Sequence, residues 1–399
     1  MSAVVAFVSP TGFGNLGDAA ILESLIAAVR RHRPDAQIVG FTQNPSDTRA
    51  RHGIPAYALS GLAVRGYRAR EVEPERPPLL ERIPVARRFL RELRHRRTSA
   101  ERLAGCDTVV IAGGGQLDDT WGGPFGHPYT LWRWGHLARR AGARYLVLSV
   151  GTGSLSRLSG VFVRRALRLA QYRSFRDARS RELAGAQAAD PVVPDLAYGV
   201  PLPAEDGPPS AIGVSPMAFA DPRYWPAGDA QRYQRHVEAL AGFTARLVRE
   251  GHRVLLFSSD TPDRPTLDEV RSRAAASLSP AERERLEVPA VDGVASLLAL
   301  LRRCQVVVAA RLHGVLLAHV AGRPALAISH ERKVRTLMDE LGHGRYCFEF
   351  DEFAAEAGWE RFRELHARHA ELAADVQRVA ADYRRRVDDQ YQRVFGGAR

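Results

Sequence analysis

The chain has 399 residues, of which 45% are hydrophobic and 26% charged, so it can bury an ordinary core, and its length predicts two domains. No stretch approaches about 20 uninterrupted apolar residues, and the first residues lack the charged start and the apolar length of a signal peptide, so we expect a cytoplasmic protein. The formal charge of +12 favours an acidic partner, which is nucleic acid, an anionic membrane surface or a phosphorylated small molecule.

Buried-strand patterns alternate with helical patterns over the first half. Continuous apolar runs at 3–9, 37–42, 108–112 and 145–150 are separated by segments with helical spacing, which is typical of a parallel sheet. We therefore predict a Rossmann-like, doubly wound domain over residues 1–200. The Pro-rich stretch PLPAEDGPP that follows predicts a linker at 201–210.

The first strand is followed by a formal GxGxxG motif at 12–17, which would suit a dinucleotide. That interpretation fails at the second strand, because it ends in FTQ at 41–43, where a dinucleotide site needs an acidic residue. The carboxylate of Asp18 would also compete with a pyrophosphate for the amides of the helix start. We interpret Asn15 and Asp18 as ligands for sugar hydroxyls. The alternative is a glycine turn in which Asp18 caps the helix.

Residues 65–102 form a basic insertion with twelve Arg against six Glu, and they supply half of the net charge. An amphipathic helix after Pro84 could lie on the inner face of an anionic membrane, which would suit a lipid-linked acceptor. The alternative is a solvated helix that packs its apolar side on the domain.

A second glycine loop, Gly113 to Gly115, follows the strand at 108–112 and lets the backbone approach a ligand closely. Gln116, Asp118 and Asp119 could contact a sugar. A metal site is the alternative, but no third ligand stands at a telling spacing, and the three isolated cysteines form no metal motif, so we expect no metal. The aromatic residues at 121–134 suit either a sugar face or a core.

The second half repeats the pattern, with strands expected at 211–215, 252–258, 305–310 and 325–329 and a helix at about 229–250. We predict a second Rossmann-like domain over 211–375, and a C-terminal helix over 376–399 from apolar residues spaced by three and four.

The most informative cluster lies where two of these strands end. The strand at 305–310 leads into Arg311, His313 and Gly314 at a helix start, where free N–H groups favour anions. The strand at 325–329 leads into His330 and Lys333, which is the only lysine in the chain. Because the carboxyl ends of parallel strands share one edge of a sheet, we expect both groups at the same rim. The alternative is that Lys333 has no function and remains by chance in a chain whose codon bias favours arginine.

These segments together resemble the polysaccharide pyruvyl transferase family over nearly the whole chain. The matching motifs, in chain order, are N-x-G-D at Asn15, Gly17 and Asp18; the glycine loop at Gly113 to Gly115; R-D-x-x-S-x-x-L at Arg176, Asp177, Ser180 and Leu183; P-D at Pro194 and Asp195; and the final block at Arg311, His313, Ala318, Gly322, Pro324 and Lys333. The family often has Tyr three residues before the Lys, whereas this chain has His330.

The resemblance implies a glycosyltransferase-B-like pair of Rossmann domains that transfers the pyruvyl group of phosphoenolpyruvate to a sugar diol as a ketal, without a further cofactor. It implies that Arg176, His313 and Lys333 are the functional cations. Phosphate and carboxylate need fixed cations, for which Arg176, Arg311 and Lys333 are suited, with Gly314 and His330 beside them. His313 is the expected acid. Asp18 or Asp118 is the expected base.

The acceptor sugar, whether lipid-linked or nucleotide-linked, is expected to contact Asn15, Asp18, Gly113, Gly114, Gln116 and Asp118 of the first domain. The main rival function is a glycosyltransferase that uses a nucleotide sugar, for which Glu331 is the evident ribose ligand. A nucleic-acid-binding module is disfavoured, because the chain has no recognisable motif for it. The pattern predicts no particular oligomeric state.

Overall fold

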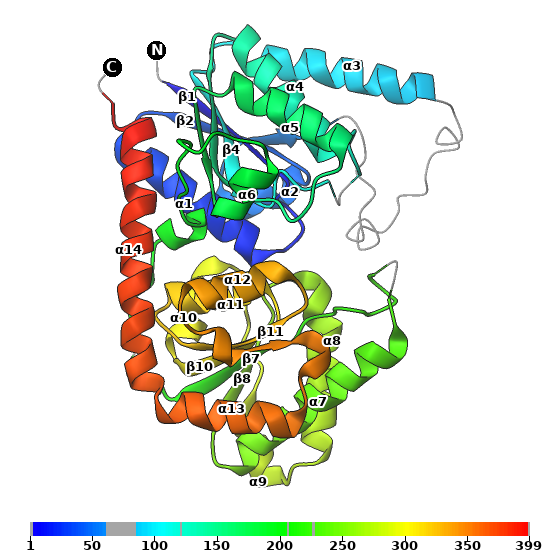
Figure 1. Cartoon of the computed structure of the whole chain (residues 1–399), viewed down its shortest axis with the longest axis vertical. Helices are drawn as coiled ribbons and strands as arrows, with labels where there is room; N and C mark the ends of the chain where they lie inside the picture. The colour runs from blue at the N-terminus through cyan, green and yellow to red at the C-terminus, as the bar shows by residue number, and fades with distance from the viewer. Residues whose placement is uncertain (1–2, 61–84, 120–121, 206, 226–227, 398–399) are drawn as a thin grey trace. The chain divides into compact units, whose positions relative to one another are not determined.

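The computed structural model describes residues 3–60, 85–119, 122–205, 207–225 and 228–397, with the backbone alone for 85–90. The chain divides into two compact units. The first comprises Met1–Phe13, Asp18–Pro201 and Tyr383–Arg399, and the second comprises Gly14–Gly17 and Leu202–Asp382. Each unit is a twisted parallel sheet with helices on both faces (Figure 1).

The sheet of the first unit has the strand order β3-β2-β1-β4-β5-β6. Every pairing in it is parallel. Its elements are β1 (Val4–Ser9), α1 (Leu16–His32), β2 (Gln37–Thr42), α2 (Pro45–His52), β3 (Ala56–Ala58), α3 (Val85–Arg102), β4 (Thr108–Gly114), α4 (His127–Arg140), β5 (Arg144–Val150), α5 (Arg157–Leu169), β6 (Tyr172–Phe175) and α6 (Ala178–Leu183). The order reverses between β1 and β4, which is the topological switch point of a doubly wound sheet.

The core of the first unit lies on the two faces of its central strands. The apolar runs of β1 and β4 are buried on both sides, as expected for a parallel sheet covered by helices. Trp134 of α4 and Leu167 of α5 pack with Val109 and Val147 on one face. On the other side, Tyr391 near the chain end shares a 2.9 Å hydrogen bond with Ser24 of α1.

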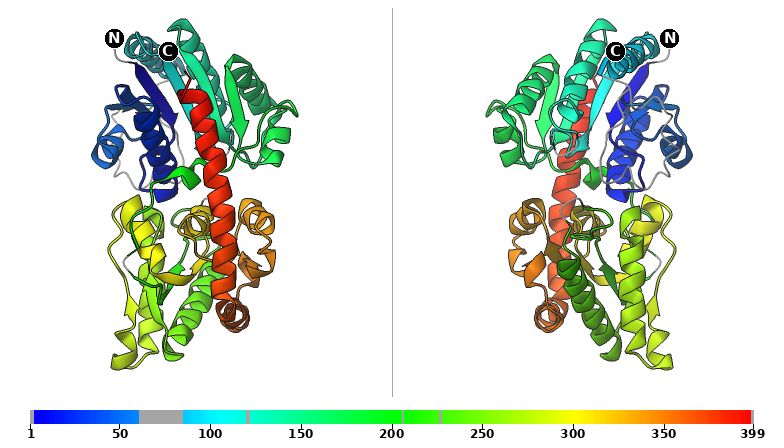
Figure 2. Two further views of the ribbon diagram at one scale, coloured as in Figure 1. Left: turned by 90° about the vertical axis from the view of Figure 1, so that its left-hand side faces the viewer. Right: turned by 90° about the vertical axis from the view of Figure 1, so that its right-hand side faces the viewer.

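The sheet of the second unit has the equivalent order β12-β11-β10-β7-β8-β9, again entirely parallel. Its elements are β7 (Ala211–Ser215), α7 (Ala230–Arg249), β8 (Arg253–Leu256), α8 (Arg264–Ala276), α9 (Pro280–Arg283), β9 (Leu286–Glu287), α10 (Val294–Arg302), β10 (Cys304–Ala309), α11 (Leu312–Val320), β11 (Ala325–Ser329), α12 (Arg332–Glu340), β12 (Cys347–Glu349), α13 (Ala355–Ala367) and α14 (His369–Phe395). Its switch point lies between β7 and β10. Figure 2 shows the helices on both sides of each sheet.

The predicted fold class, two Rossmann-like doubly wound domains with a long C-terminal helix, is confirmed. The boundaries differ in two places. The terminal helix α14 begins at His369, before the predicted 376, and its part from Tyr383 groups with the first unit. The segment Gly14–Gly17, predicted within the first domain, groups with the second unit. Of the predicted basic insertion at 65–102, residues 65–84 lie outside the described residues.

Within the described part of the chain, no helix is both long enough and apolar enough to cross a bilayer.

Buried histidines make the fold sensitive to acid. Burial lowers the pKa of His52, His127 and His330 to about 4 and that of His236 and His319 to about 3. The unfolded chain therefore takes up protons below pH 6.5, the ordinary pKa of histidine, while the folded chain stays neutral at these sites. Stability is consequently full above pH 6.5 and falls as the pH drops towards 4, by up to about 1.4 kcal/mol per pH unit for each histidine.

We expect the thermal midpoint to fall steadily when the pH is lowered from 7 to 5, measured by scanning calorimetry. His319→Leu should flatten this dependence, because both ring nitrogens of His319 are buried without a hydrogen-bond partner in the described structure. A midpoint that stays constant over this range would contradict the neutral burial of these side chains.

Candidate functional site

The switch point of the second unit brings the predicted Arg311 cluster to the carboxyl ends of two neighbouring strands. β7 ends at Ser215 and β10 at Ala309, and the two residues are paired in the sheet. The chain then turns at Ala310 and Arg311 and enters α11 at Leu312. In doubly wound sheets, ligands bind outside the carboxyl ends of the strands at this point. Arg311, His313 and Gly314 thus stand where the sequence pattern places them.

Two buried carboxylates hold the guanidinium of Arg311. Its Nε and Nη2 both donate hydrogen bonds to Asp263, and the bond from Nη2 is 2.8 Å long. Its Nη1 lies 3.1 Å from Asp260 Oδ2. The side chains of Asp260 and Asp263 are 0% and 1% exposed, so this ion pair is withdrawn from water. Arg311 is therefore fixed in orientation by a bidentate contact, as only a planar guanidinium allows.

Burial raises the pKa of Asp263, and the charge of Arg311 opposes that rise. The backbone N–H of Ala218 also donates to Asp263 over 2.9 Å, which ties the loop after β7 to the same carboxylate. The loops after β7, β8 and β10 are thus joined by one charged cluster.

Residues 15–17 of the first glycine motif contact this part of the second unit, although Asn15 lies 245 residues before Asp260 along the chain. The side-chain amide of Asn15 donates to Asp260 over 3.0 Å, and the backbone N–H of Leu16 donates to the carbonyl of Ser259 over 2.9 Å. A Cβ built on Gly17 would overlap the ring of His313. Only glycine permits this approach of the backbone at position 17 to the imidazole. Asn15 and Gly17 of the N-x-G-D motif and His313 of the R-x-H motif therefore lie together in the second unit, whereas Asp18 groups with the first unit.

The start of α1 contradicts only the alternative interpretation of Asp18, in which this residue caps the helix. Helix α1 begins at Leu16, so Asp18 lies in its first turn and is not its cap. Asn15 directly precedes the helix, and its amide bonds Asp260.

His330 and Lys333 follow β11 and share one acidic partner. Glu331 lies 3.4 Å from His330 Nε2 and 2.9 Å from Lys333 Nζ. Burial lowers the pKa of His330 to about 4, Glu331 opposes this, and the charges of Arg311 and Lys333 lower it further. His330 is accordingly a neutral, buried imidazole, whereas the side chain of Lys333 is 43% exposed.

Aromatic residues of the loop after β7 surround His330. The ring of Phe219 lies 4.9 Å from that of His330, and Trp225 lies 6.4 Å from it. Ala220 has a left-handed backbone, with φ of 62°, which is costly for a residue with a side chain and occurs mostly at functional loops. His330, at the position where the family often has Tyr, thus packs against the aromatic side chains of this loop.

The start of α11 offers further donors for an anion. The first turn of this helix has N–H groups without intrahelical partners and carries the positive end of the helix dipole. Ser215 is 2% exposed, and its Oγ has no hydrogen-bond partner within the described structure. This hydroxyl would lie 4.0 Å from a Cβ built on Gly314, so it faces the same turn. The absence of a side chain at Gly314 leaves this approach open.

Arg176 belongs to the first unit, where it follows β6. Its guanidinium lies 3.4 Å from Asp195 and 3.6 Å from Asp177, the acidic members of the P-D and R-D motifs. A Cβ built on Gly151 would contact Arg176, which explains a small residue after β5. The three motif positions therefore form one cluster within the first unit.

The other predicted acceptor residues lie at the switch point of the first unit. Gly113 and Gly114 end β4 with left-handed backbones of φ 51° and 71°, and Asp118 accepts a 3.2 Å hydrogen bond from the N–H of Gly153. Gln116 is buried, and its amide donates to the carbonyl of Ala112 over 2.8 Å. That side chain supports the loop from within, so we leave Gln116 out of the proposed sugar contacts.

No group of three or more His, Cys, Asp or Glu side chains in the described ranges is placed to hold a metal ion. Several site residues were missed by the sequence interpretation, namely Ser215, Phe219, Trp225, Asp260 and Asp263. Their position in the sequence could have identified them, because each lies at or shortly after the carboxyl end of β7 or β8, where parallel sheets bind ligands.

The two units have a glycosyltransferase-B-like fold. Solved structures with the same architecture include HepE of Anabaena in complex with UDP (13% identity, 98% of each chain covered, TM-score 0.54). They also include MnaA of S. aureus with UDP (11% identity, 94% of this chain and 91% of that chain, TM-score 0.57). A third is the UDP-GlcNAc 2-epimerase of Methanocaldococcus jannaschii (11% identity, 90% and 91%, TM-score 0.55).

The family is more specific than the fold. The polysaccharide pyruvyl transferase model matches residues 15–332, and the chain belongs to this family. The matched span begins at Asn15 and ends one residue before Lys333, so it includes both motifs that meet at His313. No curated protein matches the chain.

Proposed function

We propose that this protein transfers the pyruvyl group of phosphoenolpyruvate to a sugar diol, forming a pyruvate ketal and releasing phosphate. The observation that carries the proposal is the contact between Gly17 and His313, because it unites two motifs of a pyruvyl transferase around a candidate acid. In this proposal the reaction needs no cofactor, and phosphoenolpyruvate is a co-substrate.

The donor would bind at the start of α11. Its phosphate is a dianion that suits the free N–H groups of this turn, the hydroxyl of Ser215 and the charges of Arg311 and Lys333. Arg311 is held by Asp260 and Asp263, so its role includes orienting the turn that carries His313. Gly314 and His330 complete the donor side. Arg176 remains the predicted partner of the pyruvyl carboxylate.

The chemistry begins at the methylene carbon of phosphoenolpyruvate. His313 would donate a proton to this carbon, which becomes a methyl group, and an oxocarbenium-like centre forms at the neighbouring carbon. One sugar hydroxyl attacks this centre and loses its proton to a base. The C–O bond to phosphate then breaks with its electron pair going to the phosphate oxygen, which leaves a second oxocarbenium-like centre. The second hydroxyl attacks this centre and loses its proton to the departing phosphate, which closes the ketal. Each turnover thus adds one proton to carbon and releases one phosphate.

Acceptor binding is proposed for Asp18, Gly113, Gly114 and Asp118 of the first unit. Asn15, which groups with the second unit, remains a predicted contact, and Asp18 or Asp118 remains the predicted base. The acceptor is a free, nucleotide-linked or lipid-linked sugar with two suitably placed hydroxyls, and the enzyme is expected to work in the cytoplasm.

A nucleotide-sugar glycosyltransferase is the rival function, since HepE and MnaA carry UDP on the same fold. Glu331 is the residue that would have to hold the ribose. Its carboxylate instead lies against His330 and Lys333, at 3.4 and 2.9 Å. This engagement with the ammonium of Lys333 and the neutral imidazole of His330 disfavours a ribose at this carboxylate.

The lone lysine offers a direct test. We expect Lys333→Arg to lower turnover about tenfold with the fold retained, because a guanidinium cannot replace the compact ammonium beside Glu331. Turnover is measured as phosphate released from phosphoenolpyruvate with methyl glycosides of galactose, glucose and mannose. Arg332→Lys, at the exposed neighbouring position, is the matched control and should keep full turnover. Unchanged turnover in Lys333→Arg would mean that codon bias alone explains the lysine.

A further inference from the structure

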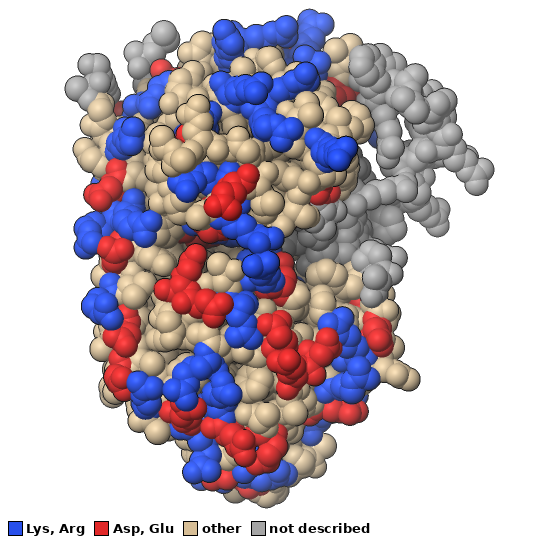
Figure 3. Space-filling model, in the orientation of Figure 1, with Lys and Arg blue, Asp and Glu red and all other residues tan. Residues whose placement is uncertain are grey.

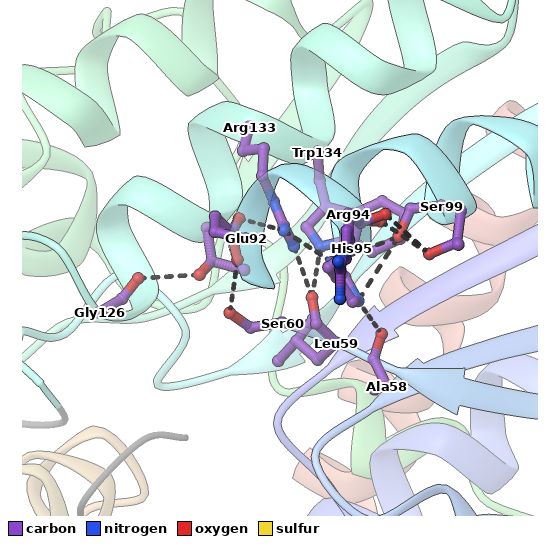
Figure 4. A network of polar contacts seen from close by, with 12 residues as sticks. Ala58, Leu59, Ser60, Glu92, Arg94, His95, Ser99, Gly126, Arg133 and Trp134 are labelled. Carbon is purple, nitrogen blue, oxygen red and sulfur yellow. Dashed lines mark hydrogen bonds and ion pairs between the residues drawn. The ribbon is translucent and has the colours of Figure 1, made fainter. Parts of the chain in front are cut away.

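Helix α3, which carries the basic segment after Pro84, is anchored to the first unit by a buried polar network (Figure 4). Arg133 of α4 pairs with Glu92 of α3 and donates to the carbonyl of Leu59 over 2.6 Å. His95 of α3 donates from Nε2 to the carbonyl of Ala58 over 2.7 Å. Because Glu92 and His95 point inward, the helix presents a fixed opposite face, on which Arg91, Arg94 and Arg97 are exposed.

A basic cavity of about 210 Å³ lies between α3 and α4. Its lining includes Arg96 of α3, Arg140 and His136 of α4, and the rings of Tyr129 and Trp132. The pKa of His136 is lowered by burial and then by Arg140, Arg139 and Arg96, which shows that positive charges converge on this cavity. A phosphate group would satisfy these cations with charge-assisted hydrogen bonds.

The same face carries no acidic counterpart on its other two helices. Neither α4 nor α5 contains an Asp or a Glu, and α5 exposes Arg157, Arg164, Arg165 and Arg168. Figure 3 shows arginine side chains gathered over the part of the first unit that these helices cover, with few acidic side chains among them. A surface of this kind attracts a negatively charged layer.

Apolar side chains project beside the arginines. Phe125, just before α4, is 62% exposed, and Leu158 at the start of α5 is 45% exposed. Behind them, the rings of Tyr129 and Trp132 lie 5.7 and 5.6 Å from that of Phe162. Proteins that bind the surface of a bilayer typically insert exposed apolar side chains at the boundary between lipid headgroups and acyl chains. Trp, Tyr and Arg side chains usually lie next to them, as they do here.

We propose that the face formed by α3, α4 and α5 docks on an anionic phospholipid bilayer, with a lipid phosphate in the cavity between Arg96 and Arg140 and with Phe125 and Leu158 at the acyl boundary. A nucleic acid would use the arginines, but it has no place for Phe125 and Leu158, and the rings behind them pack edge to face instead of offering stacking surfaces. The bilayer accounts for both kinds of side chain.

The test is co-sedimentation of the full-length protein with vesicles of phosphatidylcholine, with or without phosphatidylglycerol. We expect binding to the anionic vesicles, weakened by salt, and little binding to the neutral ones.

Arg96→Gln/Arg140→Gln should lower the partition coefficient about 25-fold, about fivefold for each arginine. Phe125→Ser/Leu158→Ser should lower it at least about tenfold without changing the salt dependence. Arg235→Gln/Arg271→Gln, which removes two exposed charges of the second unit, is the matched control and should bind as the wild type does.

Three results would overturn the proposal: no binding to anionic vesicles at low salt, equal losses in the control and the cavity variants, or vesicle binding that is unaffected by Phe125→Ser/Leu158→Ser while duplex DNA binds through the same arginines. Thermal midpoints of all variants exclude misfolding as the cause. The measurement contains no phosphoenolpyruvate, so its outcome is independent of the proposed reaction.

Discussion

Gly17→Ala is expected to lower turnover about 100-fold while the protein remains folded, because a displacement of a catalytic group by about 1 Å costs that much. A methyl group at this position would occupy the space of the His313 ring. The change from Gly to Ala within α1 is favourable for the helix itself, by about 1 kcal/mol, so a loss of turnover cannot come from helix propensity. Phosphate release from phosphoenolpyruvate with the methyl glycosides measures the effect.

The matched control for this variant is Gly242→Ala in α7. A Cβ at Gly242 would lie 3.5 Å from Ala355 Cβ, which is an ordinary contact, so turnover should not change. The donor should still raise the thermal midpoint of Gly17→Ala, because the variant displaces the acid and leaves Arg311 and Lys333 in place. Wild-type turnover in Gly17→Ala would contradict the role of His313 that we propose.

Arg311→Met is expected to lower the free energy of unfolding by about 3–5 kcal/mol and to abolish donor binding. Asp260 and Asp263 would then be buried without their cation, and an unpaired buried carboxylate is far more costly than the loss of a surface ion pair. Chemical denaturation gives the free energy of unfolding, and calorimetric titration with phosphoenolpyruvate gives the affinity.

Two companions separate these effects. Arg273→Met removes an ion pair with Glu238 whose members are 42% and 63% exposed, and it should cost less than about 1 kcal/mol. Asp263→Asn added to Arg311→Met removes one buried charge, so it should restore part of the stability but none of the affinity. If the double variant regained donor binding, Arg311 would serve only to neutralise the two aspartates.

Much of the fold could be predicted from the sequence, because long buried strands are recognisable as continuous apolar runs. The central strands β1, β2, β4 and β5 lie where those runs predict them, and the Pro-rich break marks the change of unit at Pro201. The strands that escaped prediction, such as β3 and β9, have three and two residues and lie at sheet edges. Such short segments are shaped by the neighbouring strand and carry little periodic signal of their own.

The site was predictable in part for the same reason. Strand ends place Arg311 and His330 on one sheet edge, so their segments could be assigned to one rim from order alone. The contact of Gly17 with His313 could not be predicted, because the two residues are almost 300 positions apart. It also depends on the absence of a side chain at Gly17, which leaves no pattern in the sequence. Likewise, Asp260 appears in the sequence as one polar residue in a loop, and only the fold shows that it binds both Asn15 and Arg311.

The central claim, that the second unit binds phosphoenolpyruvate, is tested most directly by the thermal midpoint of the full chain with phosphoenolpyruvate or with UDP-glucose. At a concentration of about 100 times the dissociation constant, a ligand of the folded state stabilises it by about 2.7 kcal/mol. That corresponds to an increase of roughly 5–10 °C in the midpoint for a domain of this size. We predict this increase with phosphoenolpyruvate and its loss in Arg311→Met. No increase with millimolar phosphoenolpyruvate, or an increase with UDP-glucose alone, would contradict the proposed function.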